Sequence, residues 1–81
     1  MIGAAQIRAA RALLNISQAA LADSASVSAA TVKRLEAASE VRGTAESLWK
    51  VERTLEELGV EFISAESGRG PGVRLRATAA E

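Results

Sequence analysis

Two short stretches with helical periodicity follow each other closely in SQAALADSASVSAATVKRLE, the segment that begins at Ser17. Ser17 stands before the first stretch and Ser28 before the second, and a serine in such a position can accept a hydrogen bond from the free amides of a helix. We therefore predict one helix through Ala25 and another through Ala37 or Ala38. A connection of only a few residues forces these two helices to cross at close range.

Small side chains allow such a close crossing, and Ala22 and Ala25 supply them. At helical spacing, one side of the pair forms a shared apolar core, which consists of Leu21, Val27, Val32 and Leu35. The other side keeps polar, small and cationic residues, which are Gln18, Ala29, Ala30, Lys33 and Arg34. The second helix thus presents a slim face with positive charge, and the major groove of B-DNA admits such a helix.

A helix is predicted on each side of this pair. In GAAQIRAARALLN, Ile7, Ala10 and Leu14 form one apolar stripe, and Asn15 can adopt the left-handed conformation that ends a helix. The later segment AESLWKVERTLEEL is predicted to form the fourth helix, whose buried stripe is Leu48, Val51, Leu55 and Leu58.

Capping residues bound this fourth helix. Thr44 precedes it as the predicted N-cap, and Gly59 follows it as the predicted stop. Trp49 lies slightly off the buried stripe, which fits partial burial or a dimer contact.

Alternation replaces the helical pattern after Gly59. VEFIS places Val60 and Phe62 on one face of a strand, and GVRLR does the same with Val73 and Leu75. An isolated hairpin is marginally stable and has open edges. A second subunit can pair with it, or it can pack on the end of the preceding helix and bury Phe62 and Leu75, and both arrangements can hold together. These four apolar residues are the predicted dimerisation element.

Several positions of the central helix pair resemble the helix-turn-helix of the lambda repressor and Cro family, also called the XRE-like family of bacterial regulators. They are Gln18, Leu21, Ala22, Val27, Thr31, Val32, Leu35 and Glu36. IRAARALLNISQ is similar to the first helix of the family, and LEELGVEFI with GPGVRLR is similar to the ending of many short bacterial members. Two features depart from the pattern: Ser26 stands where the turn usually has glycine, and AASEVRG replaces the usual glycine after Glu36. A serine at position 26 would strain or lengthen the turn.

The resemblance implies a mainly α fold: a four-helix repressor-like DNA-binding domain with a helix-turn-helix, followed by a short C-terminal β-strand pair. We expect the helical domain to span residues 1–59, the strand extension residues 60–77 and a flexible tail residues 78–81.

The resemblance also implies roles for individual residues. Gln18 would bond a backbone phosphate or pack on a base-contacting side chain, and Ser28 would reach phosphate too. The positions that would look into the major groove are Ala29, Ala30, Lys33 and Arg34, of which Arg34 aligns with a position that commonly reads bases. Arg11 and Glu36 would form a structural ion pair between the first and third helices. Arg42, in the basic first half of the chain, joins the expected DNA contacts.

Charge is unevenly distributed, although the formal net charge is zero. Residues 1–43 carry five Lys and Arg against three Asp and Glu, whereas residues 44–68 carry two against six. Residues 69–81 carry three against one. A modestly basic part therefore remains to meet DNA, and the acidic part would keep its side of the protein away from phosphates.

The chain contains no cysteine and no histidine. This composition excludes disulfides, thiolate or imidazole metal sites and the usual nucleophile and base pairs of hydrolases. We expect no enzymatic activity, no catalytic residue, no metal and no cofactor. No apolar run reaches membrane-spanning length, and the start lacks the pattern of a signal peptide, which predicts a cytoplasmic protein without membrane contact.

These observations predict a sequence-specific DNA-binding transcriptional regulator. It would act as a homodimer that places two recognition helices in successive major grooves of a roughly palindromic operator. The alternative is an antitoxin or other protein-interaction module with the same fold, which would bind a protein partner through the fourth helix and the strands. A DNA mobility shift in the absence of any other protein discriminates between them.

Overall fold

The computed structural model describes residues 2–37 and 45–77, and its elements follow the predicted order. The four helices are α1 (Ala4–Leu14), α2 (Gln18–Ala25), α3 (Ala29–Ala37) and α4 (Ala45–Glu57). A two-stranded antiparallel sheet follows, with β1 (Val60–Ile63) and β2 (Gly72–Leu75). The predicted fold class, a mainly α domain with a C-terminal strand pair, is confirmed.

Local chemistry sets the ends of the first three helices. The Oγ of Ser17 accepts a hydrogen bond from the Ala20 N–H at 3.0 Å, and the Oγ of Ser28 accepts one from the Thr31 N–H at 3.1 Å. The structure confirms both serines as caps. Asn15 follows α1 with a φ of 56°, the expected left-handed conformation. The predicted cap of α4 at residue 44 lies outside the described residues.

The turn between α2 and α3 contains Ser26 in the left-handed conformation, with φ 58° and ψ 42°. Any residue with a Cβ is disfavoured there, by about 1–2 kcal/mol. Two backbone hydrogen bonds hold the turn: the Ser26 N–H donates to the Asp23 carbonyl at 3.3 Å, and the Val27 N–H to the Ala22 carbonyl at 3.0 Å. The serine therefore takes the conformation that glycine adopts easily, and the turn is strained rather than rearranged.

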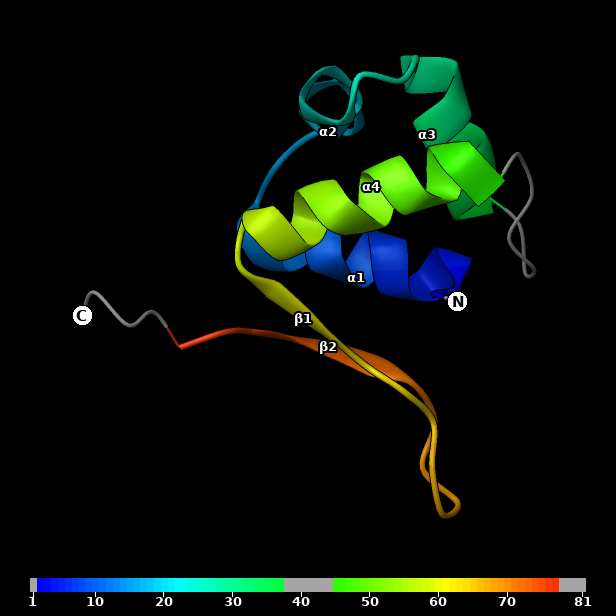
Figure 1. The fold of residues 1–81 in the computed structure, drawn as a ribbon, viewed down its shortest axis with the longest axis vertical. Coiled ribbons are helices and arrows are strands. Elements are labelled where there is room, and N and C mark those ends of the chain that lie inside the picture. The colour runs from blue at the N-terminus through cyan, green and yellow to red at the C-terminus, as the bar shows by residue number, and fades with distance from the viewer. Residues whose placement is uncertain (1, 38–44, 78–81) are drawn as a thin grey trace.

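The helices surround one apolar core. Figure 1 shows α1 and α4 next to each other, with α2 and α3 on one side of them and the sheet on the other. The largest core side chains are at most 1% exposed and come from all four helices and β1; they are Ile7, Leu21, Val32, Leu35, Leu48, Val51, Leu55 and Val60.

Leu58 departs from its prediction. It is 46% exposed, because α4 ends at Glu57 and the chain turns away at Gly59, where φ is 110°. Gly59 therefore ends the helical segment, as its position predicts. Because the last helical residue is Glu57, Leu58 does not join the buried stripe. The expectation that Leu58 is buried is wrong.

The sheet packs on two helices rather than on one. Val60 pairs with Leu75 and Phe62 with Val73, so these side chains share one face, while β1 contacts α4 and β2 contacts α1. Val60 is buried, and Phe62 and Val73 pack against the core, but Leu75 is 50% exposed. The arrangement that buries Phe62 on the helices is thus present, whereas the burial of Leu75 within one chain is not. The boundary at residue 59 between two domains stays a prediction.

The hairpin continues beyond the sheet to a tight turn. Glu66 and Arg69 exchange two backbone hydrogen bonds of 2.9 and 2.7 Å, and Ser67 and Gly68 between them have φ of 45° and 80°. Positive φ at both central residues is typical of a type I′ turn. The tip projects away from the helices (Figure 1).

A buried amide joins α1 to both strands. The Nε2 of Gln6 donates to the Ile63 carbonyl at 3.3 Å and to the Gly72 carbonyl at 3.0 Å. Its Oε1 accepts a hydrogen bond from the Gly3 N–H at 2.9 Å. One side chain, 8% exposed, therefore attaches the hairpin to the first helix.

Candidate nucleic-acid interface

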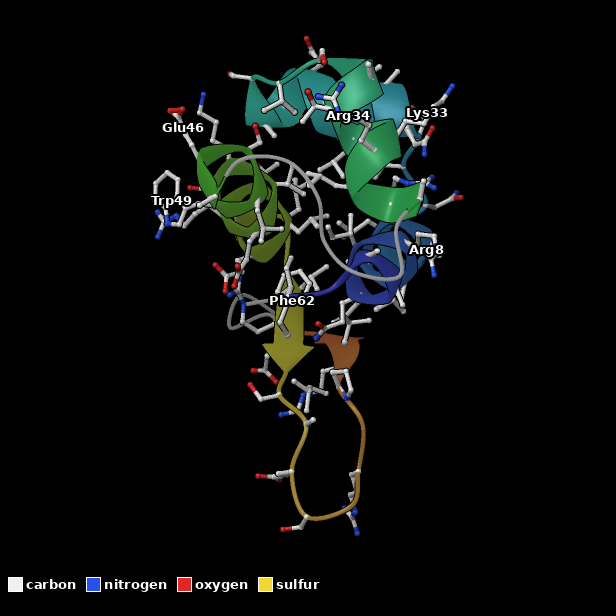
Figure 2. All side chains as sticks on the ribbon, turned by 90° about the vertical axis from the view of Figure 1, so that its right-hand side faces the viewer. Arg8, Lys33, Arg34, Glu46, Trp49 and Phe62 are labelled. Atoms are coloured by element: carbon white, nitrogen blue, oxygen red, sulfur yellow. The ribbon has the colours of Figure 1, made fainter. Side chains whose placement is uncertain are left out.

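The outer face of α3 carries the two cations of the predicted recognition helix. Lys33 and Arg34 are exposed, and so are Ala29 and Ala30 one turn earlier. The inward side of the same helix is buried and consists of Val32, Leu35 and Glu36. Figure 2 shows Lys33 and Arg34 pointing in different directions at the end of the molecule opposite the hairpin. The structure thus leaves a slim, cationic helix face open to a ligand.

Three polar side chains follow one another along this face at intervals of three residues. Ser28 Oγ and Thr31 Oγ1 share a hydrogen bond of 2.9 Å, and Arg34 Nη2 donates to Thr31 Oγ1 at 3.4 Å. The Arg34 side chain is therefore directed along the helix. Because a guanidinium has five N–H groups, this contact leaves donors for a base or a phosphate.

Behind the exposed face, the carboxylate of Glu36 binds Arg11 of α1. Arg11 Nε donates to Oε2 at 2.8 Å, and Nη2 donates to Oε1 at 3.0 Å, which is the bidentate geometry of strong ion pairs. Arg11 Nη1 also donates to the Ile16 carbonyl at 3.0 Å. The structure brings together the two residues of the expected ion pair and joins α1 to α3 through them.

Two further side chains bind Glu36. Gln18 Nε2 donates to Glu36 Oε1 at 3.1 Å, and Arg8 Nη1 donates to the Glu36 main-chain carbonyl. Burial by itself raises the pKa of Glu36, but the hydrogen bonds from Arg11 and Gln18 and the positive charges of Arg11 and Arg8 outweigh it and lower this pKa. The hydrogen bond with Glu36 in turn raises the pKa of Arg11. A carboxylate that is only 4% exposed is therefore ionised at neutral pH.

Gln18 occupies a place between the core network and solvent. One N–H of its amide binds Glu36, so its second N–H and its carbonyl remain for a phosphate or a neighbouring side chain. The phosphate contact expected of Gln18 stays a prediction, and so does the one expected of Ser28. Arg42, the remaining expected DNA contact, lies outside the described residues.

The opposite electrostatic character is found on α4. Its described residues include Lys50 and Arg53 but also four carboxylates, at Glu46, Glu52, Glu56 and Glu57. Trp49 is 59% exposed on this helix (Figure 2), and the Arg53 guanidinium lies 5.6 Å from its ring centroid. Arg53 also forms a 3.7 Å ion pair with Glu57. A surface of this kind repels phosphate. The Trp49 side chain is covered only in part within the chain, and the dimer contact considered for it stays a prediction.

Sequence reasoning missed Gln6 and Arg8. Arg8 lies one turn before Arg11, and this spacing could have indicated that both reach the same neighbour. No local signal marks Gln6, because its partners belong to the hairpin. In residues 2–37 and 45–77, no group of three or more side chains could hold a metal ion, and no described helix could cross a membrane.

A comparison with protein families agrees with this geometry. None of the curated proteins compared with the chain matches it. A family model described as helix-turn-helix matches residues 7–62, which run from α1 into β1 and include both α2 and α3. This match covers more than half of the 81 residues. The chain therefore belongs to the XRE-type helix-turn-helix family, the DNA-binding regulators that include lambda repressor and Cro.

Proposed function

We propose that the chain is a sequence-specific transcriptional regulator that binds double-stranded DNA as a homodimer. The exposed face of α3 is the observation that supports this most, because it carries Lys33 and Arg34 on a helix fixed from behind by Glu36. Two such helices would enter successive major grooves, about 34 Å apart, of a roughly palindromic operator. The extents of one protomer, 33 × 32 × 19 Å, suit two copies side by side at that spacing.

The two cations have different roles in this proposal. Arg34 reads a base, because a planar guanidinium can donate to N7 and O6 of guanine at once. Lys33 mainly neutralises phosphate, because an ammonium is a compact charge without such geometry. Ala29 and Ala30 leave room for the groove and can contact a thymine methyl group.

The test is selection of bound sequences from a random duplex library by the purified chain, with no other protein present. We expect an enriched motif with two-fold symmetry. The double variant Lys33→Ala/Arg34→Ala should lose this selection, whereas Lys50→Ala/Arg53→Ala, which removes two cations from α4, should retain it. A motif that survives loss of the α3 cations would contradict the proposed interface.

The same experiment addresses the second function class. An antitoxin or other protein-interaction module that needs its partner would enrich no motif alone. Enrichment of one asymmetric half-site would retain DNA binding but contradict the symmetric homodimer.

A further inference from the structure

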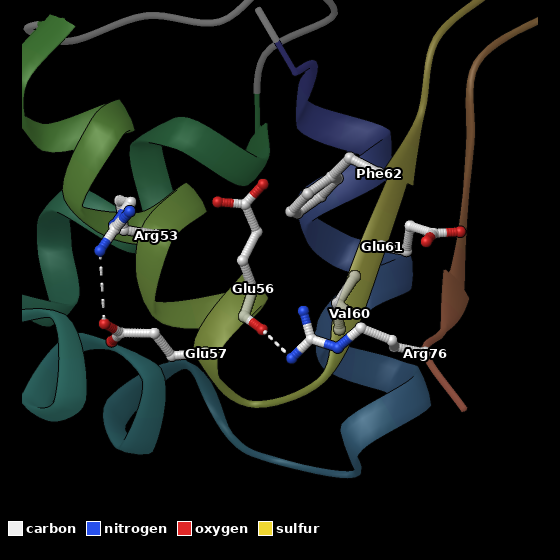
Figure 3. Close-up of a pocket in the computed structure, with 7 residues that line it drawn as sticks. All are labelled: Arg53, Glu56, Glu57, Val60, Glu61, Phe62 and Arg76. Carbon is white, nitrogen blue, oxygen red and sulfur yellow. Dashed lines mark hydrogen bonds and ion pairs between the residues drawn. The ribbon is translucent and has the colours of Figure 1, made fainter. Parts of the chain in front are cut away.

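The sheet has two open edges with different surroundings. Beside the β1 edge lies a groove of about 410 Å³ between β1 and α4. Figure 3 shows its charged lining, and the groove is lined by Arg53, Glu56, Glu57, Val60, Glu61, Phe62 and Arg76. A second copy placed on this edge would bring the carboxylates of both chains together, which is unfavourable.

The β2 edge has an uncharged surface beside it. A groove of about 210 Å³ runs between α1 and β2, and the described residues that line it are Ala5, Gln6, Ala9, Pro71, Gly72 and Val73. Leu13 lies one turn after Ala9, and Leu75 lies two residues after Val73. These two leucines are 43% and 50% exposed, so they continue the apolar surface along both elements.

The backbone of β2 is arranged to accept another strand. The Arg76 N–H donates to the Gly59 carbonyl at 2.7 Å, so these two residues form a hydrogen-bonded pair that continues the register of the sheet. The adjacent pair, Val60 with Leu75, is then a non-hydrogen-bonded pair, and so is Phe62 with Val73. Hydrogen-bonded and non-hydrogen-bonded pairs alternate in an antiparallel sheet. The N–H and C=O groups of Val73 and Leu75 therefore point away from β1, towards the open edge.

We propose that β2 pairs antiparallel with β2 of a second copy of this chain, about a two-fold axis at Arg74. In this register Val73 faces Leu75 of the partner subunit, and all four outward backbone groups on each strand segment find partners. The result is a four-stranded sheet, which is more stable than an isolated two-stranded one. This inference rests on the proposed homodimer and specifies its interface.

Side chains on both faces of the joined sheet support this register. On the helix side, each row across the four strands is apolar: Phe62 and Val73 of one copy continue into Leu75 and Val60 of the other, which covers the exposed Leu75. On the outer side, Arg74 lies opposite Arg74 of the partner subunit across the two-fold axis, and this like-charge contact is unfavourable. Each Arg74 already forms an ion pair with Glu61 on β1, which compensates this repulsion.

The pairing also places the DNA-binding helices on one side of the dimer. A two-fold axis that relates antiparallel strands is perpendicular to their sheet, so both helical layers lie on the same side of it. In each copy α3 lies beyond α1 and α4, on the side away from the hairpin (Figures 1 and 2). Both sets of Lys33 and Arg34 can therefore face one duplex.

Disulfide formation tests the axis directly, because the chain has no cysteine of its own. Cα atoms of a non-hydrogen-bonded antiparallel pair lie about 4.5 Å apart, within the range that a disulfide spans. Arg74→Cys should therefore form a covalent dimer under mild oxidation without DNA. Ser64→Cys, exposed on the other arm of the hairpin, is the matched control and should remain monomeric in denaturing electrophoresis. Equal cross-linking of the two variants would overturn the proposal.

Sedimentation equilibrium of the cysteine-free chain gives an independent measurement. Leu75→Lys should weaken self-association by about tenfold or more, because it puts a charge into the apolar row. Trp49→Lys, which changes an exposed side chain on α4, should leave it unchanged. A monomer at all micromolar concentrations, or a dimer insensitive to Leu75→Lys, would overturn the proposal. A cross-linked Arg74→Cys dimer that binds no selected duplex would instead retain the strand pairing and contradict the proposed function.

Discussion

The helix-turn-helix and the sheet are attached to the same helix, α1, by different means. At the helix-turn-helix, the buried carboxylate of Glu36 receives hydrogen bonds from Arg11 and Gln18. At the sheet, the neutral amide of Gln6 donates to one carbonyl of each strand. The polar contacts of the first attachment depend on charge and on three segments of the chain. Those of the second come from one uncharged side chain, next to the apolar packing of Phe62 and Val73.

This difference shows which contacts fix the position of the helix-turn-helix and which fix the position of the sheet. The orientation of α3 is fixed from within one chain, because its inward face is occupied by core residues and by the Glu36 network. The sheet has two strands and an exposed Leu75, so its surroundings are incomplete within one chain. The conformation of the helix-turn-helix is thus set within the protomer, whereas the sheet is suited to the association proposed above.

The largest effect is expected from breaking the charged attachment. Arg11→Met would leave the buried Glu36 carboxylate without its main partner, at a cost of about 3–5 kcal/mol of unfolding free energy. Glu36→Leu should cost less, about 1–3 kcal/mol, because the Arg11 side chain is 26% exposed and can turn to water. Denaturant unfolding of both variants and of the double variant measures this. Losses that simply add would contradict a direct coupling of the two residues.

The exposed cations on the other side of α3 should affect binding and leave stability unchanged. Arg34→Ala should cost about 1–3 kcal/mol on the preferred duplex and flatten discrimination at one base pair of each half-site. Lys33→Ala should weaken all sequences alike and reduce the slope of log affinity against log salt by about one for each phosphate interaction that the substitution removes. Titrations on single-base variants at several salt concentrations measure both. A base preference altered by Lys33→Ala alone would exchange the two roles.

The uncharged attachment should give a smaller and more local effect. Gln6→Leu removes the hydrogen bonds to Ile63 and Gly72, with an expected loss of about 1–3 kcal/mol. Amide hydrogen exchange should accelerate mainly in β1 and β2, while α2 and α3 keep their protection. Equal acceleration in both regions would show that the sheet and the helix-turn-helix unfold as one unit.

The smallest effect is expected at the strained turn inside the helix-turn-helix. Ser26→Gly should raise the unfolding free energy by about 0.5–1 kcal/mol, because glycine adopts the left-handed conformation without the Cβ penalty but gains freedom in the unfolded chain. Ser24→Gly, in the last turn of α2, is the matched control and should lower the unfolding free energy by about 0.5 kcal/mol, because glycine has a lower helix propensity than serine. Equal losses in thermal melts of both variants would contradict strain at Ser26.

The sequence predicts those features that local chemistry decides. Ser17 and Ser28 cap helices with their own neighbours, and Asn15 ends α1 through its own conformation, so a short window contains all the information. The apolar stripe of α4 is correct as far as the helix extends. The prediction that Leu58 is buried is wrong, because counting positions at helical spacing does not reveal that the helix ends at Glu57.

Long-range polar contacts are beyond reasoning from local chemistry, and the Arg11–Glu36 ion pair, which joins residues 25 apart, is expected only from the family resemblance. The acceptors of Gln6 lie 57 and 66 residues away in sequence, and the acceptor of Arg8 lies 28 residues away. An exposed or a buried glutamine reads the same in the sequence, and only the packing of the hairpin on α1 distinguishes them. In the same way, strand alternation gives the face of Leu75 but not how far the helices cover that face.

The position of Trp49 determines which spectroscopic signals can follow this protein. It is the single tryptophan of a chain without tyrosine, so it dominates absorbance and emission in the near ultraviolet. Because this indole is 59% exposed beside Arg53, water already surrounds much of it in the native state. Its emission maximum should therefore shift little on denaturation, and far-ultraviolet circular dichroism is the better signal for unfolding. The same emission should respond to ligands or quenchers that reach the outer surface of α4.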